Sequence, residues 1–461
     1  MRRKGKRTKG IEQAHPFAGM SKVNPNAAGV DIGAEEIVVC VAANESIQLV
    51  RGFGNYTVEL HAITDWLAEH KVETVAMEST GVYWIPLFEV LEQRGFECLL
   101  ISSRSLRRVS GRKSDIEDAQ WIQTLHSYGL LESSFRPQAD LIALRSLLRH
   151  RRSLIDHRSP HVLHMQKALL QMNIQLSQAV SDVTGVTGQA IIRAILSGVR
   201  DPKMLASLRE PGCKKTEEEI GKALTGTWRE EHLFVLKQAV ALYDFYTQQI
   251  LECDEEIERV YALTRPDWEA GEVKSTRTRK QNSASHSKNA PHNPELVRKH
   301  LKRISGVDIS LVDGLGVSLA QTVILECGTD MSKFPTEKHF GSWLGLAPKH
   351  EISGGKVLNN KTLKTKNRAG QAFRMAANSV KQADCAFGVM YRRLRARLGP
   401  AQATVATAYA IARVVYRMLK YKVEYDPLSE NEYQKQYEEQ QIRYMRKRAA
   451  KLGYQLLPVP A

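Results

Sequence analysis

Four acidic residues in the first quarter of the chain stand where they could bind metal ions. Asp115 and Asp118, three positions apart, follow a basic cluster in GRKSDIEDAQW, and Asp31 and Glu78 stand at the ends of predicted strands. Two carboxylates on one helical face repel each other unless a cation neutralises them. Oxygen ligands suit Mg²⁺ or Mn²⁺, and two such ions about 4 Å apart can stabilise both oxygens of an in-line phosphoryl displacement. We therefore predict a two-metal phosphodiester site.

A solvent-exposed helix start is the alternative for the two aspartates, because the helix dipole favours acidic residues there. The strand-end positions of Asp31 and Glu78 favour the metal site instead. We expect Glu36 and Glu117 to face solvent rather than bind metal.

Alternating strands and helices must bring these carboxylates together. Apolar runs and turn residues predict three strands within 27–52, a helix at 57–70, a strand at 73–80, a helix at 83–94, a strand at 96–102 and a helix from about Ser114. This order is that of an RNase H-like α/β domain, in which the first and fourth strands are neighbours at the sheet centre.

Two heptad-like stretches follow. Apolar residues recur at steps of three and four from Leu141 to Met172, with Arg151 and Arg158 in two core positions, and again from Leu236 to Val260. This spacing predicts an antiparallel coiled coil, formed within one chain or between chains. Pro160 should kink or restart the first helix.

The composition suggests six regions. We expect a basic disordered arm at 1–24, the α/β domain at 25–138 and the coiled coil at 139–265. A polar linker at 266–300, a mostly helical second domain at 301–425 and a charged tail at 426–461 should follow.

The second domain carries features of a phosphate-binding and catalytic site. Gly314 and Gly316 fit a helix-hairpin-helix, although an ordinary helical turn explains them equally well. Ser353 precedes two glycines and could attack a phosphodiester, or could simply be a turn residue. The surrounding cations could stabilise that attack or only contact phosphates: Lys349, Lys356, Lys361, Lys364, Lys366 and Arg368.

The charge balance points to nucleic acid. Lys and Arg outnumber Asp and Glu by 66 to 50, a net charge of +16. Further phosphate contacts are expected at Arg112, Lys113, Arg149, Arg151 and Arg152. Phosphate binding also explains the neighbouring histidines, from His150 to His164, better than zinc does. The six cysteines lie far apart in the sequence, so we expect reduced thiols. The apolar runs are too short for a membrane span, and we expect no signal peptide.

With Asp31, Glu78, RKSDIEDA and GSWLGLAPKHEISGGK, residues 25–425 resemble the DEDD transposases of bacterial insertion sequences named for insertion sequence 110. DAQWIQTLHSYGLLESSFRP is most similar to the subgroup named for insertion sequence 1111. The resemblance implies a RuvC-like domain whose metal-binding tetrad is Asp31, Glu78, Asp115 and Asp118, and a transposase domain in which Ser353 links covalently to cleaved DNA.

The resemblance also implies partners. A coiled coil would support a dimer, or a tetramer in the synaptic complex, with a composite site shared between protomers. A structured noncoding guide RNA would pair with donor and target DNA. Such a protein would work in the bacterial cytoplasm, associated with the nucleoid.

Three alternatives to a recombinase remain. A RuvC-like nuclease acting on branched DNA would use water as the nucleophile and would not need Ser353. A catalytically inactive RNA- or DNA-binding scaffold would tolerate Asp118→Asn. An actin-like ATPase, suggested by VDIG, is disfavoured because no second phosphate loop follows.

Overall fold

The structure is a computed structural model with two compact units, Met1–Arg136 and Pro137–Ala461. It describes residues 9–12, 17, 19–44, 47–79, 81–102, 114–265, 288–348, 351–354, 356–359, 362, 367–427, 430–455 and 457. In this described part of the chain, the helices are too short or too polar to span a membrane.

Unit 1 is built on a mixed sheet, whose strand order is β1-β4-β3-β2-β5-β6. The neighbours β1 and β4, β4 and β3, and β3 and β2 pair antiparallel. The neighbours β2 and β5, and β5 and β6, pair parallel. The predicted pairing of the first and fourth strands is confirmed, because β2 lies beside β5. The strands are β1 (Lys9–Glu12), β2 (Ala27–Ile32), β3 (Glu36–Ala42), β4 (Ile47–Gly54), β5 (Thr74–Glu78) and β6 (Glu97–Ile101).

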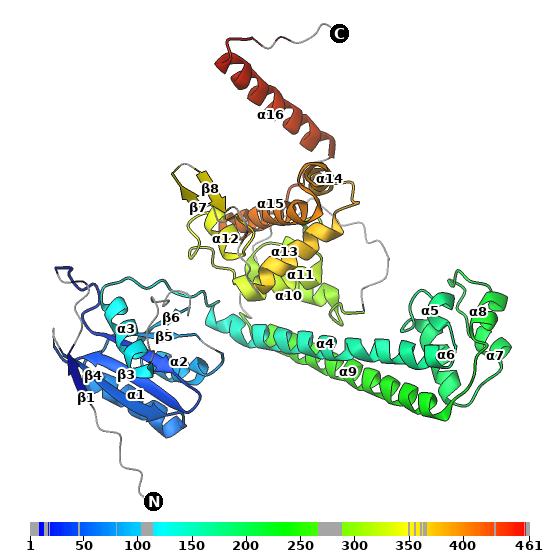
Figure 1. The fold of residues 1–461 in the computed structure, drawn as a ribbon, viewed down its shortest axis with the longest axis horizontal. Coiled ribbons are helices and arrows are strands. Elements are labelled where there is room, and N and C mark those ends of the chain that lie inside the picture. The colour runs from blue at the N-terminus through cyan, green and yellow to red at the C-terminus, as the bar shows by residue number, and fades with distance from the viewer. Residues whose placement is uncertain are drawn as a thin grey trace, which may run out of the picture. The chain divides into compact units, whose positions relative to one another are not determined.

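Helices cover both faces of this sheet (Figure 1). α1 (Thr57–Glu69) and α2 (Trp84–Gln93) bury leucines and aromatic residues against Val30, Val75 and Met77 on one face. α3 (Asp115–Ser127) packs against β2 and β3 on the other face. The apolar core of the unit therefore lies mainly under α1 and α2.

Strand β1 differs from the expected disordered arm at 1–24. Its four residues pair with Ile47–Val50 of β4. The physical reason is that β4 would otherwise expose unpaired backbone groups at the edge of the sheet.

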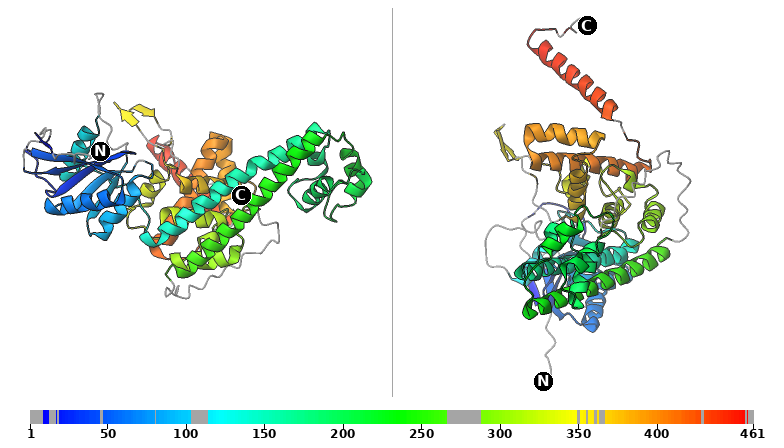
Figure 2. Two further views of the ribbon diagram at one scale, coloured as in Figure 1. Left: turned by 90° about the horizontal axis from the view of Figure 1, so that it is seen from below. Right: turned by 90° about the vertical axis from the view of Figure 1, so that its right-hand side faces the viewer.

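Unit 2 contains a long helical hairpin. α4 (Ile142–Gln171) and α9 (Glu230–Leu263) lie side by side in Figures 1 and 2. Arg151 bonds to Asp254, and Arg158, further along α4, bonds to Thr247, earlier in α9, so the helices run antiparallel within one chain. α4 continues through Pro160 as one helix, contrary to the expected restart, although a helix axis can still bend there.

Four short helices close the far end of this hairpin around an apolar core that includes Met172, Ile191 and Leu236. They are α5 (Leu176–Ala179), α6 (Val186–Leu196), α7 (Pro202–Ala206) and α8 (Glu217–Ala223).

The rest of unit 2 is mostly helical, as predicted, with one two-stranded sheet. Aromatic side chains of Phe340, Phe373 and Tyr416 pack together in its core. The elements are α10 (Pro294–Ser305), α11 (Val317–Cys327), α12 (Glu337–Trp343), β7 (Glu351–Ser353), β8 (Lys356–Asn359), α13 (Arg368–Ser379), α14 (Ala386–Leu398), α15 (Pro400–Tyr421) and α16 (Glu430–Lys451).

The helical domain begins earlier than the predicted boundary at 301. α10 starts at Pro294 and buries Val297 and Leu301. Before it, the carbonyl oxygens of Asn289 and Ala290 accept hydrogen bonds from Arg151. Part of the predicted linker thus belongs to the fold, because a buried guanidinium takes its backbone carbonyls as acceptors.

Candidate active site

Sheet register places Asp31 and Glu78 next to each other. β2 and β5 pair parallel with Val30 opposite Met77, so the next residues along both strands are Asp31 and Glu78. Val30 and Met77 point into the α1 and α2 core, and successive side chains alternate between faces. Both carboxylates therefore lie on the α3 face, at the carboxyl ends of two inner strands.

Helix α3 begins beside these strand ends. The Ser114 hydroxyl accepts a hydrogen bond from Glu117 N, and the Glu117 carboxylate accepts one from Ser114 N, both at 3.3 Å. This capping box fixes the helix start at Asp115, as the sequence predicted from Ser114. Glu117 is thereby assigned a structural role, while Asp115 is exposed and Asp118 partly buried.

A glycine allows α3 to approach the sheet closely, and sequence reasoning missed it. A Cβ atom on Gly29 of β2 would lie 2.2 Å from Gln123 N and 2.4 Å from Ala119 O, distances that real contacts do not reach. Two residues further along the strand, Asp31 points to the same face. The absence of a side chain at Gly29 is therefore what brings α3 within reach of Asp31.

Buried amides orient α3 on the sheet. The Gln48 amide nitrogen donates to Gln123 Oε1 at 2.7 Å and to Thr124 Oγ1 at 3.1 Å. Gln123 Nε2 donates to the carbonyl of Ala27 at 3.2 Å, and Thr74 and His126 share a 2.9 Å hydrogen bond. This polar contact fixes the rotation of α3 more specifically than an apolar contact would, because hydrogen bonds have directional geometry.

The four carboxylates interact through their charges. Burial, followed by the charges of Asp115, Asp118 and Glu78, raises the pKa of Asp31 from 3.8 to about 6. The residues predicted from distant sequence positions are thus within electrostatic range of one another.

Donor chemistry at this place fits a hard divalent cation. All four groups offer carboxylate oxygens, and after burial the negative charges of the other three contribute to the raised pKa of Asp31, a repulsion that a cation would relieve. Within the described residues, however, His, Cys, Asp and Glu side chains nowhere gather in threes closely enough to hold a metal ion. The side chains of the tetrad would have to draw together around an ion.

Ser353 lies in an exposed β-hairpin. It ends β7 and pairs with Lys356 of β8 across the hairpin. Gly354 adopts φ +54°, which glycine does without strain. The Ser353 hydroxyl is therefore accessible, and the positive φ that follows it explains why position 354 is a glycine.

The cations expected around Ser353 are described only in part. Lys356 and Arg368 are exposed, consistent with phosphate contact. The other expected phosphate contacts of this loop and of the segment before α3 lie outside the described residues: Arg112, Lys113, Lys349, Lys361, Lys364 and Lys366.

Three arginines of α4 have different environments. The guanidinium of Arg151 is buried against Asp254 at 2.5 and 2.9 Å, which corrects the expectation of a phosphate contact. The buried position requires an ionic partner inside the fold. Arg149 donates two hydrogen bonds to Glu326, at 2.8 and 2.6 Å, whereas exposed Arg152 pairs with Asp156 on the same helix.

The two hairpin glycines also differ. Gly314, at φ +85°, packs against α13, where an added Cβ would lie 2.5 Å from the carbonyl oxygen of Ala376. A side chain at Gly314 would therefore overlap α13, which explains the glycine, and the expected phosphate contact of its backbone stays a prediction. Gly316 caps α11 and has open space around it.

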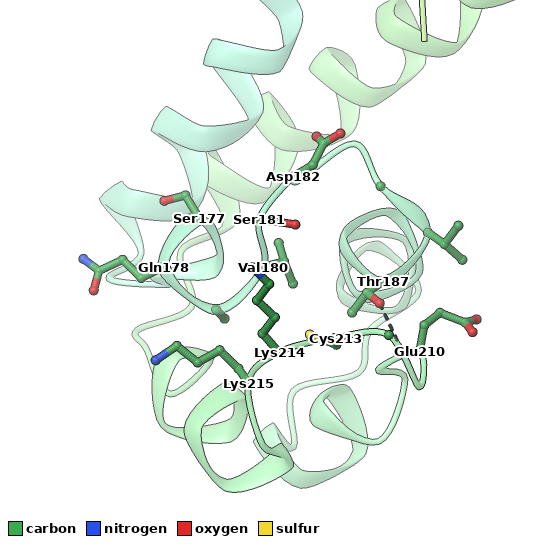
Figure 3. A pocket seen from close by; sticks show the side chains of 14 residues that line it. Ser177, Gln178, Val180, Ser181, Asp182, Thr187, Glu210, Cys213, Lys214 and Lys215 are labelled. Atoms are coloured by element: carbon green, nitrogen blue, oxygen red, sulfur yellow. Dashed lines mark hydrogen bonds between the residues drawn. The ribbon is translucent and has the colours of Figure 1, made fainter. Parts of the chain in front are cut away.

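A pocket at the far end of the helical hairpin is separate from the carboxylates (Figure 3). It lies between α5, the start of α6 and the 210–215 segment, where Thr187 Oγ1 accepts a hydrogen bond from Glu210 N. Lys214 and Lys215 border it, but so do Asp182 and Glu210. This mixture of charges gives no ligand class, and we assign none.

Unit 1 thus has Asp31 and Glu78 at neighbouring strand ends and Asp115 and Asp118 at the start of α3, and unit 2 has an exposed serine in a mostly helical region. Residues 28–174 match the IS110 DEDD family model, described as a transposase. Residues 309–391 match the model described as transposase IS116/IS110/IS902 family. The first match contains the four carboxylates and the second contains Ser353. Curated proteins give no match to the chain.

Proposed function

We propose that this protein is the transposase of an IS110-type insertion sequence, a recombinase that cleaves and rejoins DNA strands. The observation that carries the proposal is the convergence of Asp31, Glu78, Asp115 and Asp118, expressed in the raised pKa of Asp31. Two transposase family matches on the segments that hold these residues and Ser353 support it.

The carboxylates are the proposed holders of Mg²⁺ or Mn²⁺. Such ions supply Lewis acidity to phosphoryl oxygens. The chain contributes Asp31 and Glu78 from rigid strand ends and Asp115 and Asp118 from the first turn of α3, consistent with an RNase H-like domain of the RuvC type.

Ser353 is the proposed nucleophile. Its attack would form a bond from Oγ to a DNA phosphorus and break the bond to one strand oxygen, which leaves as a hydroxyl after taking up a proton. The exposed hairpin and Lys356, which pairs with Ser353 across it, support this role. The serine and the carboxylates would work together in a composite site between protomers.

Assembly and guidance are further parts of the proposal. The antiparallel pairing of α4 with α9 within one chain supports a coiled-coil region, and this region would serve assembly into a dimer, with a tetramer in the synaptic complex. A structured noncoding RNA would select donor and target DNA. These features follow from the IS110 resemblance, and the stretch DAQWIQTLHSYGLLESSFRP supports membership of the IS1111 subgroup.

Covalent protein–DNA adducts distinguish recombination from hydrolysis. On a donor DNA with the element's own RNA, the wild type should form adducts, Ser353→Ala none, and Ser353→Cys some. Asp118→Asn should lose adducts and products alike. Full strand cleavage by Ser353→Ala would instead support a RuvC-like hydrolytic nuclease, and unchanged products with Asp118→Asn would exclude the tetrad.

A further inference from the structure

The last helix carries a dense group of positive charges. Arg443, Arg446, Lys447, Arg448 and Lys451 occur within nine residues of α16, which we call the α16 cationic segment. The sequence contains no Asp or Glu after Glu439. Residues 441–448 and Lys451 are exposed, so these charges face solvent. Figure 1 shows α16 as the helix coloured red.

Only one of these five charges has an ion-pair partner among the residues that the structure describes. Arg443 pairs with Glu439 at 3.4 Å on the preceding turn. Among the residues that the structure describes, Arg446, Lys447, Arg448 and Lys451 form no ion pair. Like charges one turn apart destabilise a helix, so an external polyanion would relieve their repulsion.

The helix dipole explains only part of this pattern. It favours cations within the last turn, which holds Arg448 and Lys451. It does not account for Arg443 and Arg446, which lie further from the helix end. Tyr444, 59% exposed, stands among the cations and offers a ring that can stack on a base.

The helix has two faces. Arg443, Lys447 and Lys451 follow at steps of four and share one face, while Ile442, Met445 and Ala449 form a narrow apolar stripe on another. Helices that lie in membrane interfaces present wide faces with Trp, Phe and Leu. The apolar stripe of α16 has only Ile442 and Met445 as larger residues, with Ala449 beyond them, so it is too narrow for a membrane interface. This favours a polyanion in water as the partner of α16 over a lipid surface.

We propose that the α16 cationic segment binds the phosphate backbone of nucleic acid, as a site additional to the tetrad and the Ser353 hairpin. The choice of nucleic acid as the polyanion rests on the proposed function. Contacts of this type fix position without reading bases, so binding should be independent of sequence.

The test is the salt dependence of DNA binding by the full chain. Arg446→Gln/Lys447→Gln/Arg448→Gln should lower affinity for a random duplex and reduce the slope of log K against log salt by about 2 to 3, since each lost phosphate contact removes about 0.9. The control Lys203→Gln/Arg229→Gln/Lys237→Gln removes the same charge from other exposed sites and should change the slope by less than half as much.

The inference would be overturned if Arg446→Gln/Lys447→Gln/Arg448→Gln had the same salt slope as the wild type. It would also be overturned if the two triple variants lost the same amount of slope. Loss of binding to anionic phosphatidylserine vesicles without a change in the DNA slope would assign the segment to membranes instead. The readout is binding and needs no catalysis, so a lack of covalent adducts would refute the proposed catalysis without changing the difference in slope between the two triple variants.

Discussion

Gly29 of β2 lies directly against the backbone of Gln123 in α3. A side chain at position 29 would overlap the Gln123 nitrogen, with only 2.2 Å between it and the Cβ atom. Because α3 carries Asp115 and Asp118, this contact sets how close those aspartates come to Asp31. The spacing of the proposed metal site thus depends on a residue that binds no metal.

Gly29→Ala should separate α3 from the sheet. Overpacking of this kind costs about 1 to 3 kcal/mol, so the domain should still fold. We expect recombination to fall by at least about tenfold, because misplaced catalytic groups lose much of their effect. An NMR titration should also show the pKa of Asp31 moving from about 6 towards 3.8.

The matched control is Gly212→Ala, since an added Cβ there meets nothing within 4 Å. It should leave stability and activity unchanged. Wild-type activity of Gly29→Ala, with an unchanged Asp31 titration, would contradict the role given to this contact.

Asp31→Asn should stabilise the metal-free protein while abolishing catalysis. The native pKa of Asp31, about 6, exceeds its ordinary 3.8, so the folded state holds the extra proton between these values. Stability therefore falls as pH rises through this window. Removing the charge should recover up to about 3 kcal/mol at pH 7, less where solvent screens the carboxylates.

Urea unfolding at pH 4 and pH 7.5, with chelator or with Mg²⁺, measures this effect. With chelator, the free energy of unfolding of Asp31→Asn should exceed that of the wild type at pH 7.5 and nearly equal it at pH 4. Mg²⁺ should stabilise the wild type more than the variant. Asp65→Asn, on the exposed surface of α1, is the control. A variant less stable than the wild type at pH 7.5 with chelator would refute the prediction.

Arg151→Met should strongly destabilise the helical hairpin. It leaves Asp254 buried without its ionic partner, a change that costs about 3 to 5 kcal/mol. Arg151→Met/Asp254→Leu should recover most of that loss. Chemical unfolding measures both variants, with exposed Arg152→Met expected within about 0.5 kcal/mol of the wild type. No recovery in the double variant would mean that the bonds to Asn289 and Ala290 dominate.

Glu326→Gln should weaken the contact of α4 with α11. Burial raises the pKa of Glu326. The hydrogen bond from Arg149 and the charges of Arg145 and Arg149 lower this pKa by more than burial raises it, so the net shift is downward from 4.5. The stabilisation is therefore present above about pH 4.5 and disappears as pH falls through the lowered native pKa.

Thermal unfolding should show a loss of about 1 to 3 kcal/mol for Glu326→Gln at pH 7, and a smaller difference from the wild type at pH 3. Glu256→Gln, which removes an exposed pair with Arg259, is the control and should have little effect. A difference that grows at low pH would contradict the assignment.

The sequence by itself determined the order of strands and helices from β2 to α3, the start of α3 at Ser114 and the candidate carboxylates. Apolar periodicity and capping are local properties, so they can be read from neighbouring residues. It also indicated the α4 and α9 pair, because heptad spacing needs no tertiary information.

Only the tertiary structure decided which polar residues face inward. Arg151 and Arg152 are adjacent cations in sequence, yet Arg151 is buried against Asp254, 103 positions away, while Arg152 is exposed. Gly29 and Gly314 likewise gained their roles from backbone segments distant in sequence. Contacts between distant segments depend on how the elements pack, and local residue patterns carry little of that information.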